Sequence, residues 1–165
     1  MTRVLDEDPE LGERLPEGER RGAEDAAIAR TESLSEGNWT EPDDPDRYRD
    51  GFGLLVLDGI LARRVELERF ECTEVLGQGD LLRPWAFDAP GTASIPVGVV
   101  WNVLEPARFA VLDRRFAIAT AQWPELSAAL MDRSIRAVNG SRSPTGAQSN
   151  AGAICWDRLG ITAGI

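Results

Sequence analysis

The segment GDLLRPW, which ends at Trp85, holds the residues of this chain best suited to ligand chemistry. It completes a glycine turn, GQGD, and brings one carboxylate, one guanidinium and one indole close together. A guanidinium binds anions through charge-assisted hydrogen bonds, and an indole supplies a flat apolar wall. We predict a ligand-binding loop formed by Gly79, Asp80, Leu82, Arg83 and Trp85. In the alternative interpretation Arg83 is a surface charge and Trp85 only fills the mouth of a β-barrel.

Two residue types that serve many enzymes are missing. The 165 residues include no histidine, and all 18 basic residues are arginine. Without imidazole there is no His metal ligand and no histidine general base, and without lysine there is no Schiff base or P-loop. The acids of residues 41–46 lack the spacing of a calcium-binding EF-hand loop. We predict no catalytic residue, no metal site, no cofactor and a protein that is not an enzyme.

The N-terminus and the two cysteines bear on the cellular compartment. The first 15 residues, MTRVLDEDPELGERL, are acidic and lack an apolar signal region, so we expect a cytoplasmic protein. No apolar run is long enough to cross a membrane. Cys72 and Cys155 form no CxxC motif, and disulfides are rare in the cytosol, so we expect two ordinary thiols.

Charge is distributed unevenly along the chain. The net charge is −10, and residues 1–50 carry 16 acids against seven arginines, which leaves the rest of the chain nearly neutral. An acidic chain without a basic cluster repels a phosphate backbone. Direct DNA binding by this chain alone is therefore disfavoured.

The first 50 residues are expected to form an acidic helical segment and a loop. Asp8-Pro9 is typical of a helix start, and a second helix is expected to begin at Pro16 and run through Ile28, with Arg30 near its end. From residue 51 the pattern changes to short apolar runs separated by glycine turns. Asp58-Gly59 between two such runs predicts a tight β-hairpin. This alternation of short apolar runs and glycine turns predicts an antiparallel jelly-roll barrel, mainly β with flanking helices.

A long helix is predicted to follow the barrel. It begins at Pro124 and ends before Gly140, and it carries an apolar stripe at helical spacing. The stripe either packs into the core of the same chain or forms a homodimer interface; its residues are Leu126, Leu130, Ile135 and Val138. Residues 51–139 then make up the barrel and its helix, and residues 140–165 are expected to be an irregular tail.

Four segments in order carry a resemblance to a known family: GLLVLDGILARRV, VLGQGDLLRPW, WNVLEPARFAVLDRRF and WPELSAALMDRSIR. Together they resemble the sensor domain of Crp/Fnr-type transcription regulators over most of residues 3–137. The resemblance implies a cyclic-nucleotide-binding-like jelly roll, a long dimerisation helix and a C-terminal winged helix-turn-helix. We expect the last part to be missing, through truncation or a frameshift, because residues 141–165 are too short and aperiodic for it.

The resemblance fails at the residues that hold a cyclic nucleotide. Arg83-Pro84 stands where nucleotide-binding members have a Gly-Glu pair for the ribose, and residues 92–97 contain no arginine for the phosphate. We expect a sensor domain with a degenerate pocket or with a different, small anionic effector. The alternative is a non-catalytic interaction or remnant domain without a ligand. A cupin-type enzyme shares the architecture, but its sites use histidine, which this chain lacks.

Overall fold

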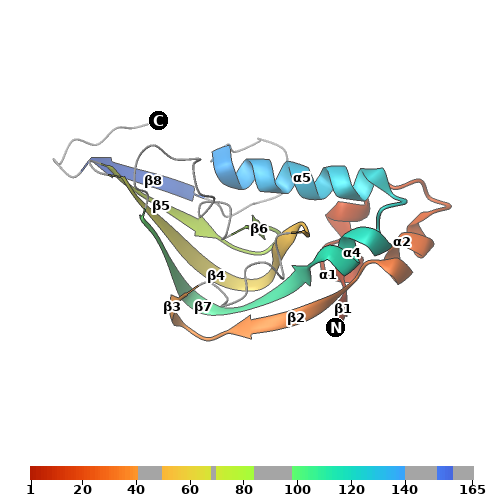
Figure 1. Cartoon of the computed structure of the whole chain (residues 1–165), viewed down its shortest axis with the longest axis horizontal. Helices are drawn as coiled ribbons and strands as arrows, with labels where there is room; N and C mark the ends of the chain where they lie inside the picture. Colours follow the sequence, from red (N-terminus) through yellow and green to blue (C-terminus); the bar gives the residue numbers. More distant parts are fainter. Residues whose placement is uncertain (41–49, 68–69, 84–97, 140–151, 158–165) are drawn as a thin grey trace.

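The fold is a curved antiparallel sheet with helices packed at one end (Figure 1). The structure is a computed structural model, and it describes residues 1–40, 50–67, 70–83, 98–139 and 152–157. The strands are β1 (Thr2–Arg3), β2 (Ile28–Leu34), β3 (Gly37–Trp39), β4 (Gly53–Leu67), β5 (Phe70–Leu76), β6 (Leu81–Leu82), β7 (Gly98–Leu112) and β8 (Gly152–Asp157). The helices are α1 (Val4–Glu7), the 3-10 helix η1 (Pro9–Gly12), α2 (Arg20–Ala26), α4 (Arg114–Ala119) and α5 (Pro124–Asn139).

Two long strands, β4 and β7, form the centre of the sheet. Each has 15 residues, and they pair with each other along nearly their whole length. The hydrogen-bonded order is β1-β2-β7-β4-β5-β8, with β3 added on β7 and β6 added on β4, and every pair is antiparallel. The predicted antiparallel β architecture with flanking helices and a long C-terminal helix is confirmed.

The hairpin predicted at Asp58-Gly59 is wrong. The chain continues through both residues within β4, and the register against β7 shifts there, which is a β-bulge. Gly59 has φ +93°, and a Cβ at this position would collide with the carbonyl of Pro106. The glycine is therefore needed for a bend within one strand, not for a reversal between two. The observed reversal joins Leu67 to Phe70.

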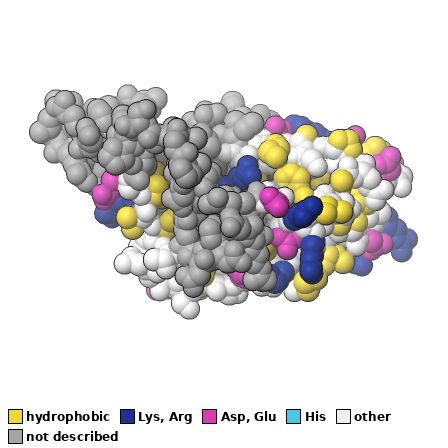
Figure 2. All heavy atoms as spheres, viewed as in Figure 1, with side chains coloured by type: hydrophobic (Ala, Val, Ile, Leu, Met, Phe, Trp, Pro, Cys, Tyr) yellow, Lys and Arg dark blue, Asp and Glu magenta, His cyan; other side chains and the backbone are white. Residues whose placement is uncertain are grey.

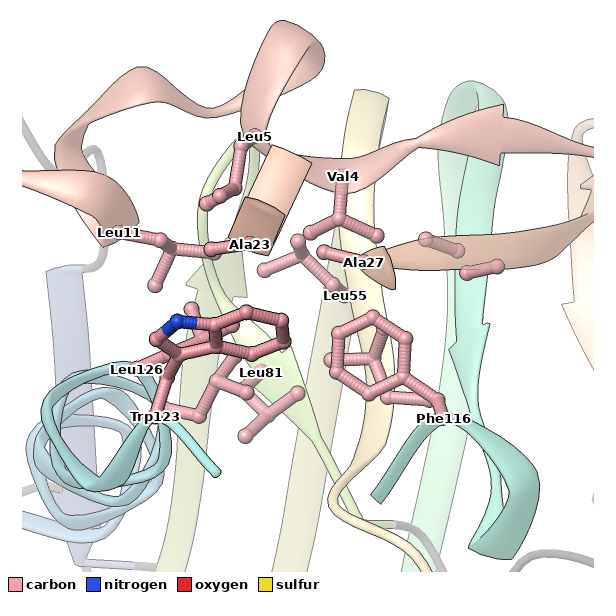
Figure 3. Packing of buried hydrophobic residues seen from close by; sticks show 14 of the residues in the cluster. Val4, Leu5, Leu11, Ala23, Ala27, Leu55, Leu81, Phe116, Trp123 and Leu126 are labelled. Carbon is pink, nitrogen blue, oxygen red and sulfur yellow. The ribbon is translucent and has the colours of Figure 1, made fainter. Parts of the chain in front are cut away.

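Two hydrophobic clusters lie on opposite faces of β4. The helix-side cluster packs the helices onto one face (Figure 3) and comprises Val4, Leu5, Leu11, Leu15, Ala23, Ala27, Ala29, Leu55, Leu57, Leu81, Ala110, Leu112, Phe116, Trp123, Leu126 and Leu130. The sheet cluster on the other face comprises Leu54, Val56, Leu61, Leu76, Leu82, Trp101, Val103, Ala107, Phe109 and Val111. Successive residues of a strand point to opposite faces, so β4 and β7 contribute to both clusters.

The N-terminal 50 residues are less helical than predicted. Pro9–Gly12 is a single 3-10 turn, and the second helix ends at Ala26. Ile28–Leu34, which the sequence placed partly in that helix, is a strand that pairs with β7. The helices after the sheet agree better with the prediction. Asp113 caps α4 by accepting bonds from two backbone amides, and α5 begins at Pro124.

Two expectations for the C-terminal part and the cysteines are also wrong. Gly152–Asp157, placed in an irregular tail, forms β8 and pairs with β5. Cys72 is disulfide-bonded rather than a free thiol. Its backbone partner in the β5–β8 ladder is Cys155, the other cysteine of the chain. The expectation of free thiols rested on an assumed reducing compartment, whereas the strand pairing that brings the two backbones together cannot be seen in the spacing of the cysteines.

Candidate functional site: the glycine turn and the arginine of α5

The predicted GQGD turn is present between β5 and β6. The Gly77 amide donates to Asp80 Oδ2 at 2.8 Å, and the Asp80 amide donates back to the Gly77 carbonyl at 3.0 Å. Gly79 has φ +85°, a conformation that favours glycine, and its amide donates to the Val56 carbonyl at 2.9 Å. The turn is thus closed by its own carboxylate and fastened to β4.

The turn is held from outside by Arg133 of α5. Its Nη1 donates to the Gly79 carbonyl at 2.6 Å, and its Nη2 donates to Asp8 Oδ1 at 3.0 Å and to Glu10 Oε2 at 3.1 Å. The Arg133 and Asp8 side chains are 11% and 10% exposed. Burial raises the pKa of Asp8, and the Arg133 charge partly opposes that rise. We call these four residues the Arg133 junction. It joins η1, the turn and α5.

The residues predicted to bind a ligand take different structural roles. The Asp80 side chain closes the turn, and Leu82 is buried in the sheet cluster. Arg83 Nη2 lies 3.5 Å from the Gly51 carbonyl, and its buried Nε has no hydrogen-bond partner in the described part of the chain. Trp85 lies outside the described residues. Of the predicted set, Arg83 alone keeps a free donor for a ligand among the side chains that the structure describes.

The apolar stripe of α5 packs inward. Leu126 and Leu130 are completely buried in the helix-side cluster, and Figure 3 shows Leu126 next to Trp123. Neither side chain is accessible to a second copy of the chain, so these two residues are corrected from dimer interface to core. A helical stripe shows that a face is buried but not which partner buries it. The side chains of Ile135 and Val138 lie outside the described residues.

A second polar cluster lies on the face of the sheet that carries the sheet cluster. Trp39, Trp101, Arg63 and Glu74 are successive cross-strand partners on β3, β7, β4 and β5. Arg63 forms an ion pair with Glu74, and both side chains are nearly buried, at 13% and 7% exposure. Burial raises the pKa of Glu74, and the Arg63 charge opposes the rise. We call these four residues the inner row.

Sequence reasoning missed both the Arg133 junction and the inner row. Arg63 and Glu74 are eleven residues apart, and their pairing follows only from the register of β4 and β5. Each of the two strands carries more than one charged residue, so the sequence does not single out Arg63 and Glu74. Arg133 gives no signal either, because its partners lie 54 to 125 residues away.

Other kinds of site find no support in the described residues. These residues contain no cluster of His, Cys, Asp and Glu side chains that could hold a metal ion. None of the helices within them is long and apolar enough to cross a membrane. On the face shown in Figure 2, arginine and acidic side chains lie intermixed over the helical end of the molecule and form no separate basic patch.

Comparisons with known proteins find similarity in solved structures only. No protein-family model and no curated protein matches the chain. A crystal structure of oxidized CprK in complex with o-chlorophenolacetic acid is 10% identical, with a TM-score of 0.44; the match covers 74% of this chain and 47% of that one. The N-terminal domain of a transcriptional regulator from Streptomyces coelicolor A3(2) is 17% identical, with a TM-score of 0.45 and coverage of 84% and 97%. A CooA mutant from Carboxydothermus hydrogenoformans is 19% identical, with a TM-score of 0.41 and coverage of 85% and 88%.

These three structures are of Crp/Fnr-family regulators, the family that the four sequence segments resemble. With TM-scores below 0.5, these likenesses assign neither a family nor a residue role to this chain. The chain spans about half of the CprK chain that it matches.

Proposed function

We propose that this chain is a regulatory sensor domain of the Crp/Fnr type whose effector is not a cyclic nucleotide. The proposal is supported by the four segments in family order and by a curved antiparallel sheet followed by a long helix. The observation that carries it is the bond from Arg133 to the Gly79 carbonyl. This bond connects the turn, which belongs to the ligand-binding loop of this family, to the long helix α5. In such a domain the helix would transmit the change between the ligand-free and the ligand-bound state.

The proposed effector is a small anion that binds at Arg83. A cyclic nucleotide needs a carboxylate for its ribose and an arginine for its phosphate, and the corresponding positions of this sequence provide neither. Arg83 instead offers a buried Nε–H that has no acceptor among the residues that the structure describes. A charged donor of this kind binds a carboxylate or another oxyanion more strongly than a neutral group does.

Signalling by self-association belongs to the proposal, but the interface must differ from the one first predicted. Leu126 and Leu130 are core residues, so a two-fold pairing would use the exposed side of α5, where Met131 is 44% exposed. Operator binding is not assigned to this chain, in keeping with its net charge of −10. The absence of catalytic activity remains part of the same proposal. The expected cytoplasmic location is not carried into it, because Cys72 is disulfide-bonded and disulfides are rare in the cytosol.

Thermal unfolding with a panel of small molecules tests the effector. A ligand that binds only the folded state raises Tm. We expect a rise with at least one of acetate, citrate, phosphate and an aromatic carboxylate, and no rise with cyclic AMP or cyclic GMP. The rise should vanish in Arg83→Gln and persist in the control Arg14→Gln, whose exposed side chain contacts Asp132 on the surface.

Two outcomes would overturn parts of the proposal. Stabilisation by a cyclic nucleotide would contradict the assignment of a different effector. A flat response to the whole panel would favour the alternative of an interaction domain without a ligand. Light scattering at high protein concentration tests self-association separately, and a monomer there would remove the dimer.

A further inference from the structure

The disulfide of Cys72 joins the last strand of the sheet to its neighbour. Cys72 lies on β5, and its backbone partner on β8 is Cys155, the only other cysteine of the chain. β8 comes last in the strand order and, among the described strands, pairs with β5 alone. Figure 1 shows β8 at the end of the sheet opposite to α1, α2 and α4. The disulfide therefore fastens an edge strand to the body of the sheet.

The two hydrophobic clusters do not depend on this bond. Of the described side chains of β5, only Leu76 belongs to either cluster, and most of the other members come from β4, β7 and the helices. Small secreted domains use disulfides as staples because they cannot build a sufficient core. A chain with two buried clusters has no such need, which favours a use of the disulfide other than holding the fold together.

The position of the bond suits reversible reduction. Cys72 is only half-buried, and a disulfide is reduced when a thiolate from solution reaches one of its sulfur atoms. Without the bond, β8 is held by backbone pairing to one neighbour along its six residues. Elements of this kind open at low free energy. A cross-link between residues this far apart in sequence also removes much of the entropy that a released strand gains.

We propose that the disulfide between Cys72 and Cys155 is a redox-sensitive link that controls the attachment of β8. In the oxidised chain β8 is held on β5. In the reduced chain β8 separates from β5, while β4, β7 and the helices packed on them stay folded. The proposal uses no residue of the effector loop and does not depend on the proposed function. It agrees with the general observation that disulfides in the cytosol, where they occur, are usually catalytic or redox-sensing.

A dithiol reductant, such as dithiothreitol or a thioredoxin-type protein, supplies the two electrons. One of its thiolates attacks a sulfur of the disulfide, the S–S bond breaks, and the other cysteine leaves as a thiolate that takes up a proton. The second thiol of the reductant then loses its proton and attacks the mixed disulfide. This step releases the remaining cysteine, which is protonated in turn. The products are two protein thiols and the disulfide of the reductant.

Amide hydrogen exchange on the full chain, oxidised and reduced, tests the proposal. With dithiothreitol and no denaturant, we expect the amides of β8 to exchange about tenfold faster or more, and those of β4 and β7 to keep their rates. Alkylation with iodoacetamide, counted by mass spectrometry, verifies that both thiols have formed. Replacing dithiothreitol by oxidised glutathione should restore the slow exchange of β8.

Two variants show whether the sulfur atoms cause the change. Cys72→Ser/Cys155→Ser should give the exchange pattern of the reduced chain with and without dithiothreitol. Thr73→Ser is the control, because Thr73 is next to Cys72 on β5 and pairs with Ile154 of β8. This variant keeps both cysteines, so it should respond to dithiothreitol as the wild type does.

Four results would overturn the proposal. The first is a native disulfide that excess dithiothreitol leaves unreduced, as shown by the absence of alkylation. The second is equal exchange of the β8 amides in the oxidised and reduced chains. The third is a loss of protection in β4 and β7 together with β8, which would make the disulfide a structural staple. The fourth is a failure of oxidised glutathione to restore slow exchange, since a switch must work in both directions.

Discussion

The Arg133 junction and the inner row are both built around a nearly buried arginine and an acid whose pKa is raised by burial, yet they differ in two respects. Arg133 donates to three acceptors from two other elements, at sequence separations of 54 to 125. Arg63 pairs with Glu74 on the adjacent strand, eleven residues away, and the neighbouring Trp101 indole N–H has no acceptor within the described part of the chain.

This difference suggests different reasons for keeping the two clusters. The junction fastens a helix, a turn and the N-terminal segment together, so it has a structural use. The row holds two strands that already pair through their backbones. A buried ion pair is often no more stabilising than apolar residues of the same volume. We therefore expect the row to contribute less to the free energy of unfolding than the junction does.

The largest effect is expected at the junction. Arg133→Ala removes three hydrogen bonds and leaves Asp8 buried without its counter-charge, so we expect a loss of about 3–5 kcal/mol in the free energy of unfolding. Urea denaturation measures it. The control is Arg14→Ala, whose exposed ion pair with Asp132 should contribute about 0–1 kcal/mol. Equal losses in the two variants would contradict a structural use of the junction.

A smaller effect is expected in the inner row. Arg63→Met leaves the buried Glu74 carboxyl without its counter-charge, but this carboxyl can take up a proton. We therefore expect a loss of about 2–3 kcal/mol in the free energy of unfolding. The double variant Arg63→Met/Glu74→Leu should recover most of that loss or exceed the stability of the wild type. The same urea measurement applies. A double variant less stable than the single one would show that the pair itself stabilises the sheet.

The turn within the junction gives the next smaller effect. Gly79→Ala places a side chain on a residue with φ +85° and pushes a Cβ against the guanidinium of Arg133. We expect a loss of about 1–2 kcal/mol from the backbone strain. Gly18→Ala is the matched control, because a Cβ there meets no atom within 4 Å. Its stability should stay within about 0.5 kcal/mol of the wild type.

The smallest expected effect is a pH dependence of the stability, with opposite signs for an acid whose pKa is raised and an acid whose pKa is lowered. The pKa of Glu74 is raised above its ordinary 4.5, so its contribution to stability is full below pH 4.5 and is lost as the pH rises through the folded value. The pKa of Glu7 is lowered by hydrogen bonds from Arg108 and Thr2, which gives the opposite sign. Urea curves from pH 4 to 7 should show the wild type losing stability relative to Glu74→Gln with rising pH, and gaining it relative to Glu7→Gln. Parallel curves would contradict both directions.

Features that depend on neighbouring residues could be predicted from the sequence. The GQGD turn, the Asp113 cap and the start of α5 at Pro124 each follow from a few adjacent side chains. Asp58-Gly59 shows the limit of such reasoning. The same dipeptide suits a hairpin or a bulge, and only the pairing of β4 with β7 decides between them.

The candidate sites were harder to predict because they depend on strand register and on distant contacts. The sequence placed a ligand at Arg83 from its loop, but the register places Arg63 beside Trp101 and Glu74. The stripe with Leu126 and Leu130 was recognised correctly as apolar, yet its partner is the N-terminal segment and the sheet of the same chain. No local pattern contains that information.

The two-faced strand β4 has a consequence for how the molecule opens. Leu55 and Leu57 lie in the helix-side cluster, while Leu54 and Val56 lie in the sheet cluster. Neither cluster can come apart without removing residues that the other one needs. The amide hydrogens of β4 and its partner β7 should therefore exchange with solvent only when the whole domain unfolds, as one cooperative unit, rather than through separate openings of its two halves.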